Sequence, residues 1–408
     1  MKIVRNILCL ILAVLFCVSS VLPALATTFV TSVNPVPNSS APIAVVMDFY
    51  TGEILYERNM EQRWIPASMT KSMVAFIVYQ EIEAGNLSLD TEILVSQEAA
   101  SFSSNRRVPG SYVPLPAGEL LTVDTLLQLL MIPSGNAAAV VFAEFISGSE
   151  EAFVERMNET AEELGMYAEY TNSHGAFVNY TNAYSIAILI REFITLYPDI
   201  LRITNMPNVR FRGRTYRNTN HLVSRTRFRG CDGFKTGSLR QAGWNHSTTA
   251  VRDGRRIIAV VMNTPSNSAR QSQSRILLDF GFDEIERREA ERIDKARVFF
   301  SGELIPLTML PRIYYGRLSL PASDIMEHLG YIVRRNEEHG LVSVSHASGL
   351  TATLFEDRDL AVVNGDTFTL PSPVQVIGDQ MYFSAEAVGL LTGTAVDWSL
   401  ETGVIRFR

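Results

Sequence analysis

The sequence predicts an α+β protein with a larger N-terminal domain and a small duplicated module at its C-terminus. Two strand-like stretches, at residues 43–56 and 235–263, enclose a mostly helical region, and such segregation of strands and helices is typical of the α+β class. A charge-dense segment follows at 283–297, and the chain beyond it repeats itself. The length of 408 residues, 47% of them hydrophobic, suits two or three domains with cores of their own.

The first 26 residues have the pattern of a secretory signal peptide. Lys2 and Arg5 precede an apolar run over residues 7–22, and Ala24-Leu25-Ala26 offers the small residues that a signal peptidase recognises. We expect cleavage after Ala26, with a short membrane anchor as the alternative. No later stretch is long and apolar enough to span a bilayer. We therefore expect a secreted, extracytoplasmic protein without a transmembrane helix, associated with the cell wall.

The net charge excludes a basic nucleic-acid binder, and the cysteine content excludes a disulfide within the mature chain. Loss of Lys2 and Arg5 with the signal peptide changes the formal net charge from −7 to −9, and no Lys/Arg run occurs, which excludes a generally basic nucleic-acid binder. Cys231 is the single cysteine outside the signal peptide, so a disulfide within the mature chain is excluded. We expect Cys231 to be a small core residue.

The first domain begins with a leader, a hairpin and a long helix. Residues 27–42, rich in Thr, Ser, Pro and Asn, predict a flexible leader, and residues 43–56 predict a hairpin around Thr51-Gly52. The run from Ser68 to Ala84 is apolar on nearly all sides, which indicates a buried helix, and Gly85-Asn86 ends it.

The rest of the domain is expected to be helical and then to return to strands. Residues 122–197 predict mainly helices, and two strand patterns around Asp253-Gly254 predict a second hairpin. We place this domain at 43–285, a charged linker helix at 286–297 and the C-terminal module at 298–408.

The C-terminal module contains a duplication. The segment from Gly316 to Val342 recurs as the segment from Gly378 to Ile405, at an offset of 62 residues at the first glycine and 63 at the last. Gly302 and Gly365 also match. Each copy is expected to form short strands, a small helix and a strand pair. Because one copy is too small to bury a core, we expect the two to pack together.

Three short motifs carry the chemistry: Ser68-Met69-Thr70-Lys71, Ser134-Gly135-Asn136 and Lys235-Thr236-Gly237. Ser68 opens a helix, and Lys71 lies one turn later on the same face, within reach of the hydroxyl. Burial among apolar neighbours disfavours the charged lysine, and a neutral amine can take the serine proton. Each motif alone is weak, but the three in this order behind a signal peptide predict an exported serine acyl-transfer enzyme.

The other two motifs have supporting roles. Ser134 and Asn136, on a loop between helices, can relay a proton and hold a substrate carbonyl. Lys235 supplies positive charge, and Gly237 lets a peptide approach the strand closely.

These motifs resemble those of penicillin-binding proteins and class A β-lactamases. The finer match is to the serine D-alanyl-D-alanine carboxypeptidases, the low-molecular-mass penicillin-binding proteins, over about residues 40–285. Further stretches carry this resemblance: Asp48 to Tyr56, Pro66-Ala67, Gly110-Ser111 with Pro116 to Glu119, Asn172-Ser173-His174-Gly175, and Asp253 to Val261.

The resemblance implies a fold and an activity. The fold would be β-lactamase/transpeptidase-like, with a five-stranded antiparallel sheet flanked by helices and a helical subdomain. The activity would be removal of the terminal D-Ala from peptidoglycan stem pentapeptides through an acyl-enzyme on Ser68, with β-lactams as inhibitors. Lys71 would be the acylation base, assisted by Ser134 and Asn136. No metal or other cofactor is implied.

The resemblance also implies a substrate-binding set. Lys235 and Thr236, followed by Gly237, would bind the substrate carboxylate, with help from Arg270. The backbone N–H groups of Ser68 and Ser238 would form the oxyanion hole. Two departures leave substrate preference and deacylation rate open: Ala137 replaces an acidic residue after Ser-Gly-Asn, and Ser238-Leu239 replace a larger residue and Thr after Lys-Thr-Gly.

The C-terminal module resembles copper amine oxidase N-terminal-like modules of exported proteins. Its three histidines, His328, His339 and His346, lack the spacing of paired ligands, so copper is not expected. With no nucleophile–base pair of its own, the module is expected to act as a spacer or to bind wall polymer or a protein partner.

Two alternative functions stay open. A class A β-lactamase needs a Glu-x-x-x-Asn loop, whereas this chain has Glu155-Arg156-Met157-Asn158, one residue shorter. A catalytically retired wall-binding protein is the second alternative, and the intact catalytic side chains argue against it.

Overall fold

The computed structural model describes residues 36–408, with gaps at 105–107, 224–226, 294–295, 310, 357, 378–379 and 400–402. The expected signal peptide and residues 27–35 of the expected leader lie outside the described residues. The end of that leader differs from the prediction. Ser39 and Ala41 are buried, and the Ser39 hydroxyl donates to Gln273 Oε1 over 2.9 Å. These contacts fix the chain just before the first strand.

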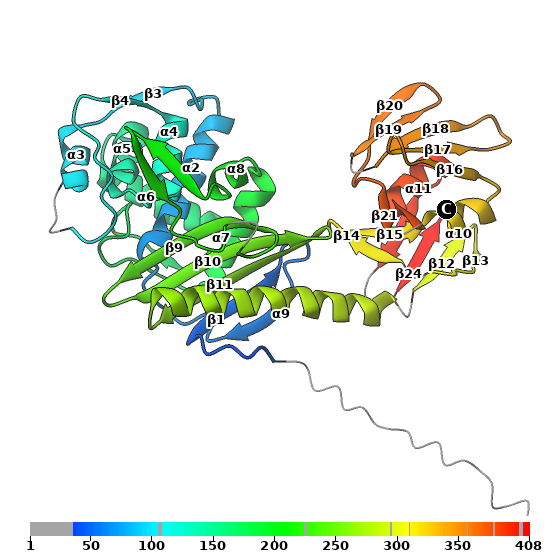
Figure 1. Cartoon of the computed structure of the whole chain (residues 1–408), viewed down its shortest axis with the longest axis horizontal. Helices are drawn as coiled ribbons and strands as arrows, with labels where there is room; N and C mark the ends of the chain where they lie inside the picture. Colours follow the sequence, from blue (N-terminus) through cyan, green and yellow to red (C-terminus); the bar gives the residue numbers. More distant parts are fainter. Residues whose placement is uncertain are drawn as a thin grey trace, which may run out of the picture. The chain divides into compact units, whose positions relative to one another are not determined.

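The predicted five-stranded antiparallel sheet forms the centre of the first domain (Figure 1). Its strand order is β2-β1-β11-β10-β9. Both predicted hairpins are confirmed: β1 pairs with β2 and β10 with β11. β9 pairs with β10 alone among the described residues, so one of its edges is free of strand partners. The strands are β1 (Ile43–Asp48), β2 (Ile54–Arg58), β9 (Cys231–Leu239), β10 (Gly243–Arg252) and β11 (Arg255–Thr264).

Helices bury both faces of this sheet. Ile43 and Val45 of β1 belong to the larger core cluster with α2, whereas Ala44 and Val46, which alternate with them, belong to a second cluster with α9. Figure 1 shows α9 along its own face of the sheet. The helices are α2 (Lys71–Glu83), α3 (Gln97–Ser104), α4 (Val123–Met131), α5 (Asn136–Ser147), α6 (Glu150–Glu163), α7 (Ala183–Leu196), α8 (Ile200–Thr204) and α9 (Asn267–Ile293).

Three two-stranded sheets complete the domain. They are β3 (Glu92–Leu94) with β4 (Leu120–Thr122), β5 (Ala168–Glu169) with β6 (Tyr180–Thr181), and β7 (Asn208–Phe211) with β8 (Arg214–Arg217).

The charge-dense segment continues α9 instead of forming a separate linker helix. α9 runs without a break from Asn267 to Ile293. Within the segment, Glu284 and Ile285 are buried, and Glu284 accepts hydrogen bonds from Arg287 and Arg288. Pairing of the charges along the helix lets one side pack on the domain while the other stays exposed.

The duplication of the C-terminal module is confirmed in its elements. Each copy has two short strands, a helix and a strand pair. The first copy comprises β14 (Arg312–Tyr314), β15 (Arg317–Pro321), α10 (Ala322–His328), β16 (Ile332–Asn336) and β17 (Leu341–Ser345). The second comprises β21 (Gln375–Ile377), β22 (Gln380–Ser384), α11 (Ala385–Thr392), β23 (Val396–Ser399) and β24 (Val404–Phe407). The remaining strands are β12 (Arg297–Phe300), β13 (Glu303–Ile305), β18 (Thr351–Phe355), β19 (Leu360–Val363) and β20 (Asp366–Thr369).

The two copies share one core, as expected. β15 pairs with β22 so that Leu320 lies opposite Phe383, its own counterpart in the repeat. Both residues are fully buried in a single cluster with Ile325 and Val388, one from each copy's helix. The pairing of equivalent residues gives the module an internal two-fold arrangement.

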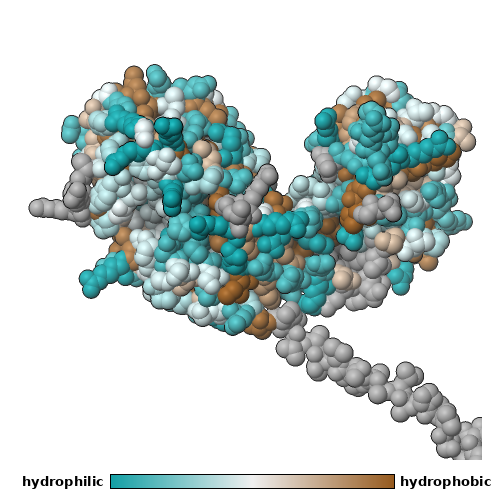
Figure 2. Space-filling model, viewed as in Figure 1, coloured by the Kyte–Doolittle hydropathy of each residue, from teal (hydrophilic) through white to brown (hydrophobic). Residues whose placement is uncertain are grey.

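Hydrophilic residues cover most of the described surface in the view of Figure 2, and hydrophobic residues form small separate patches there. Among residues 36–408, leaving aside the stated gaps, no helix has both the length and the apolar character that a bilayer crossing requires.

Candidate active site

Ser68 lies where a tight turn enters the buried helix. A 3-10 turn, η1 (Ala67–Thr70), leads directly into α2, where the sequence predicted a regular helix from Ser68. Residues three apart eclipse each other in a 3-10 helix, so this turn aligns Ser68 with Lys71. Ala67 has a φ of 51°, a left-handed conformation that non-glycine residues rarely adopt and that is often found at functional sites.

The Lys71 side chain is fully buried among oxygen acceptors. Its Nζ lies 3.1 Å from Ser68 Oγ and 2.9 Å from Asn136 Oδ1, and it also donates to the backbone oxygen of His174. The Asn136 and His174 oxygens can only accept hydrogens. A neutral amine therefore gives them its two N–H groups and turns its lone pair toward the Ser68 hydroxyl. This is the geometry that a general base for Ser68 requires.

Burial also sets the protonation of this site. It lowers the pKa of Lys71 from 10.5 to about 7, so a large share of the amine is neutral at neutral pH. Burial, together with the charge of Lys71, lowers the pKa of His174 to about 3, which keeps that imidazole neutral. The sequence-based expectation of a depressed lysine pKa agrees with this environment.

Asn136, the first residue of α5, reaches Lys71, and Ser134 lies two residues earlier on the loop that leads into this helix. Ser134 is buried with a φ of 67°, and its Oγ has no hydrogen-bond partner among the described residues. Asn136 accepts from Lys71 and donates through Nδ2 to the Pro109 oxygen over 3.0 Å. The amide that the sequence suggested for a substrate carbonyl thus holds Lys71 in this structure, while the Ser134 hydroxyl stays available.

Gly237 brings the free edge of β9 against the nucleophile. A Cβ at Gly237 would lie 2.2 Å from Pro66 O and 3.1 Å from the Ser68 nitrogen, so a larger residue would push β9 away from η1. The close approach places the residue after Gly237, Ser238, beside the start of η1. The two N–H groups expected to form an oxyanion hole therefore come from segments in direct contact.

Lys235 and Thr236 precede this contact on β9. Lys235 is 1% exposed, and its Nζ donates to Thr236 O over 3.1 Å. Burial, and then the nearby charges of Lys71 and Arg270, lower the pKa of Lys235. A positive charge on Lys235 is therefore stabilised best when an anion lies against it. Thr236 Oγ1 donates to Thr219 Oγ1 over 2.7 Å.

Arg270 lies near the site but contacts the strand backbone. Its Nη1 donates to Gly237 O over 3.1 Å and to Asn245 O over 3.3 Å, and its guanidinium lies 5.0 Å from the centre of the Trp244 ring. The side chain is 4% exposed. Arg270 thus fixes β9 and β10 at the level of Gly237 and adds positive charge behind the strand.

The loop around His174 belongs to the site, although the sequence analysis gave it no role. Gly175 packs so tightly that a Cβ there would lie 2.1 Å from Ala67 O, and Asn172 Oδ1 accepts from the Gly175 nitrogen over 2.7 Å. Asn179 Nδ2 also donates to Thr70 Oγ1 over 3.0 Å. This loop presents the His174 oxygen to Lys71. In the sequence, the stretch Asn172-Ser173-His174-Gly175 could have indicated this role, because it resembles the corresponding stretch of the carboxypeptidase family.

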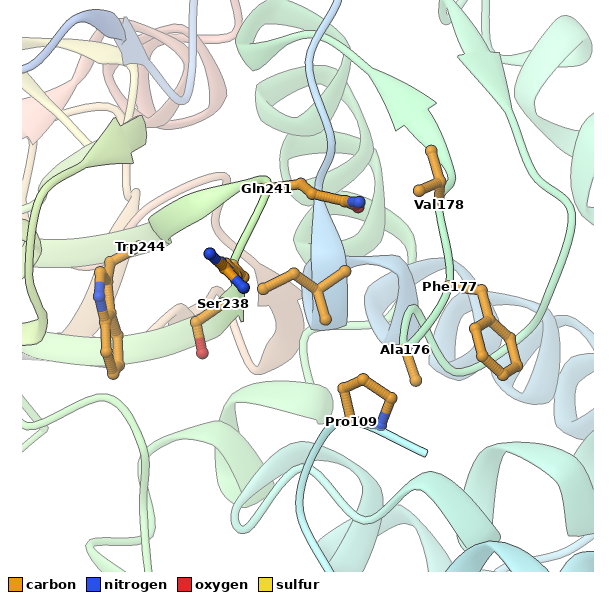
Figure 3. A pocket seen from close by; sticks show the side chains of 9 residues that line it. Pro109, Ala176, Phe177, Val178, Ser238, Gln241 and Trp244 are labelled. Atoms are coloured by element: carbon orange, nitrogen blue, oxygen red, sulfur yellow. The ribbon is translucent and has the colours of Figure 1, made fainter. Parts of the chain in front are cut away.

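A cavity of about 790 Å³ opens beside these groups. Figure 3 shows Ser238 and Trp244 on one side of it and Phe177 on the other, with Pro109 between them. The lining is mainly apolar: Pro109, Ala176, Phe177, Val178, Leu239 and Trp244, with Ser238, Arg240 and Gln241.

Comparison with known proteins gives two matches that divide the chain. Residues 30–266 match the family described as D-alanyl-D-alanine carboxypeptidase, peptidase S11. Residues 299–407 match the copper amine oxidase N-terminal domain. Both resemblances seen in the sequence are therefore confirmed.

Two curated relatives support the first match. D-alanyl-D-alanine carboxypeptidase DacF of Bacillus subtilis is 35% identical over 254 residues, which span 60% of this chain and 63% of that protein. D-alanyl-D-alanine carboxypeptidase DacD of Salmonella typhimurium is 32% identical over 368 residues, which span 86% of this chain and 90% of that protein.

Solved structures agree on the fold. PBP3 of Streptococcus pneumoniae, described as a peptidoglycan synthesis regulatory factor, superposes with a TM-score of 0.57 at 31% identity, covering 60% of this chain and 72% of that one. Penicillin-binding protein D2 of Listeria monocytogenes, solved in a cefotaxime-bound form, gives a TM-score of 0.53 at 27% identity, covering 61% of this chain and 99% of that one. With its family match over more than half of its length, the chain belongs to the D-alanyl-D-alanine carboxypeptidase family.

Proposed function

We propose that this chain is an exported serine-type D-alanyl-D-alanine carboxypeptidase, which removes the terminal D-Ala from peptidoglycan stem pentapeptides through an acyl-enzyme on Ser68. The observation that carries the proposal is the buried Lys71 amine, 3.1 Å from Ser68 Oγ and held by the Asn136 and His174 oxygens. Such a contact activates a serine hydroxyl that is otherwise a weak nucleophile.

Acylation begins with binding of the substrate's terminal carboxylate at Lys235 and Thr236. The anion stabilises the ammonium of Lys235, whose pKa burial otherwise lowers. The neutral Lys71 then takes the Ser68 proton as Ser68 Oγ attacks the carbonyl carbon of the penultimate D-Ala. The Ser68 and Ser238 N–H groups stabilise the oxyanion that forms.

Collapse of this intermediate requires a proton on the leaving nitrogen. The Ser134 hydroxyl, buried without a partner among the described residues, passes a proton from the Lys71 ammonium to the departing D-Ala. Lys71, neutral again, accepts a proton from the water that hydrolyses the Ser68 ester. Asn136 and Arg270 act through position, since Asn136 holds Lys71 and Arg270 holds the backbone of Gly237.

The site also fits β-lactams as inhibitors, since they carry a carboxylate beside a reactive amide. The Listeria protein described above was solved with cefotaxime bound. The competing function is that of a class A β-lactamase, which needs a glutamate for deacylation. The structure does not favour Glu155 in that role. Glu155 is exposed on α6, and Asn158 is occupied by the backbone oxygens of Val154 and Tyr170.

The proposed setting is outside the cell membrane, at the cell wall, with peptidoglycan stem peptides as substrate. The C-terminal module, which supplies none of the site residues, would attach the enzyme to wall polymer or to a protein partner.

Digestion of purified muropeptides tests the proposal. Mass spectrometry should find pentapeptide stems converted to tetrapeptide stems with release of D-Ala, and Ser68→Ala should abolish the conversion. A fluorescent penicillin should remain bound to the wild-type protein for far longer than a β-lactamase turnover. Rapid penicillin hydrolysis with intact pentapeptides would instead support the β-lactamase.

A further inference from the structure

The cavity beside Ser238 continues the proposed active site. At one end, Ser238 follows Gly237, which packs against the Ser68 nitrogen. At another, Pro109 accepts the hydrogen bond from Asn136. A substrate that reaches Ser68 therefore has this cavity, of about 790 Å³, as the neighbouring space.

The direction of the substrate along β9 decides which part of it enters the cavity. This inference rests on the proposed function, in which the terminal carboxylate binds at Lys235 and Thr236. Attack by Ser68 occurs beside Gly237 and Ser238, so the peptide runs antiparallel to β9 along its free edge. With about 3.4 Å per residue, the residue that precedes the two D-alanines lies beside Leu239 and Arg240.

Among the described residues that line the cavity, Arg240 is the single charged one. It is exposed, and among the described residues it has no carboxylate or other hydrogen-bond partner. Its surroundings are apolar: Leu239 ends β9, Trp244 lies on β10, and Phe177 lies across the cavity (Figure 3). A guanidinium in such a place attracts a carboxylate, and the apolar walls accept an aliphatic chain.

We propose that Arg240 and this cavity bind the side chain of the residue before the D-Ala pair, and that they select an aliphatic side chain that ends in a carboxylate. A diamino acid of the 2,6-diaminopimelate type has such a side chain. Lysine has the same aliphatic length but ends in an ammonium group alone, which the Arg240 charge repels. Arg240 is thus a specificity-determining residue, and the preferred substrates are stems with a free carboxylate at this position.

The test compares two soluble pentapeptides that differ only in the third residue, meso-2,6-diaminopimelate or L-lysine. For the wild-type protein we expect kcat/KM to be up to about fivefold higher on the diaminopimelate peptide, which is the most that one exposed charge contact provides. Arg240→Gln should remove most of this preference, and Arg240→Glu should reverse it. Thermal unfolding of each variant checks that it is folded.

A matched control is Arg210→Gln, which removes an exposed arginine on β7, outside the cavity lining. It should leave the ratio of the two kcat/KM values unchanged. Equal kcat/KM for the two peptides, or a preference that survives Arg240→Glu, would overturn the inference and leave the carboxypeptidase activity standing. Failure of the wild-type protein to cleave either peptide would overturn the proposed function and this inference with it.

Discussion

At the scale of single residues, the proposed mechanism depends on how the protein holds Lys71. Lys71 is buried with two oxygens that can only accept its hydrogens and one hydroxyl that can donate to it. Burial lowers its pKa to about 7, so about half of the amine is neutral, and able to act as a base, near physiological pH. The position and the protonation of Lys71 thus both favour its role as general base.

Replacement of Lys71 by arginine should remove the base while keeping a cation. Because a guanidinium stays protonated, we expect the rate of acylation by a penicillin to fall by roughly 10²-fold or more. Stopped-flow measurement with a chromogenic β-lactam gives this rate. Ser72→Ala, a change at the neighbouring buried hydroxyl, serves as control and should acylate normally. Near-normal acylation of Lys71→Arg would exclude general-base work by Lys71.

The pH profile of acylation should report the same group. The pKa of Lys71 is lowered, so the amine becomes neutral as pH rises through about 7. The acylation rate constant should therefore increase about tenfold per pH unit below this value and level off above it. His174 should not contribute, since its pKa lies at about 3. A flat profile between pH 5 and pH 8, on the order of three units, would contradict a titrating Lys71.

At the scale of elements, the site depends on contacts among segments that are distant in sequence. The Ser68–Lys71 pair is local, and the spacing of the motif was enough to predict it. The His174 oxygen and the Pro109 oxygen come from loops. Asn172 and the packing of Gly175 on η1 position the first, and the hydrogen bond from Asn136 holds the second. Those contacts are tertiary, so residue patterns could not place them.

In the fold as well, local features were predictable from the sequence and features that depend on tertiary contacts were not. Hairpins around Thr51-Gly52 and Asp253-Gly254 were predictable because turn residues and alternating strands are local signals. The 3-10 turn at Ala67–Thr70 was not predicted, because its backbone lies against Gly237 and Gly175, which are distant in the sequence. The continuity of α9 was also missed, because Glu284 is buried through pairing with Arg287 and Arg288.

The approach of β9 to η1 gives a test at this scale. A Cβ in Gly237→Ala would lie 2.2 Å from Pro66 O, so β9 must shift away from Ser68. A displacement of about 1 Å at a reacting centre costs on the order of 10²-fold in rate, and we expect such a loss in acylation. Gly213→Ala is the control: its Cβ meets open space in the β7–β8 turn, and although its φ of +72° makes the change cost some stability, acylation by the folded protein should stay nearly unchanged. Unchanged acylation of the Gly237 variant would show that the close contact is unnecessary.

At the scale of the whole molecule, the C-terminal module has a hydrophobic core separate from those of the first domain. Among the residues whose side chains the structure describes, the core clusters of the first domain contain none after Ile285, and the C-terminal cluster contains none before Ala296. Each site residue lies in the first part. This separation supports catalysis by the first domain and attachment or spacing by the second.

Removal of the C-terminal module should therefore leave the chemistry intact. A chain that ends near Lys295 should cleave a soluble pentapeptide at a rate within about threefold of the full chain, or about 0.6 kcal/mol in barrier. Its retention on isolated cell walls should decrease if the module is the attachment. A truncated protein that folds but loses most activity on the small substrate would mean that the module helps to form the site.

The most direct test of the central claim is identification of the acylated residue. The protein is incubated with a penicillin, digested, and analysed by tandem mass spectrometry. The account predicts one adduct per chain, on the peptide that contains Ser68 and on its side chain, with none in the Ser68→Ala protein. An adduct on another residue, or a stoichiometric adduct in the Ser68→Ala protein, would contradict it.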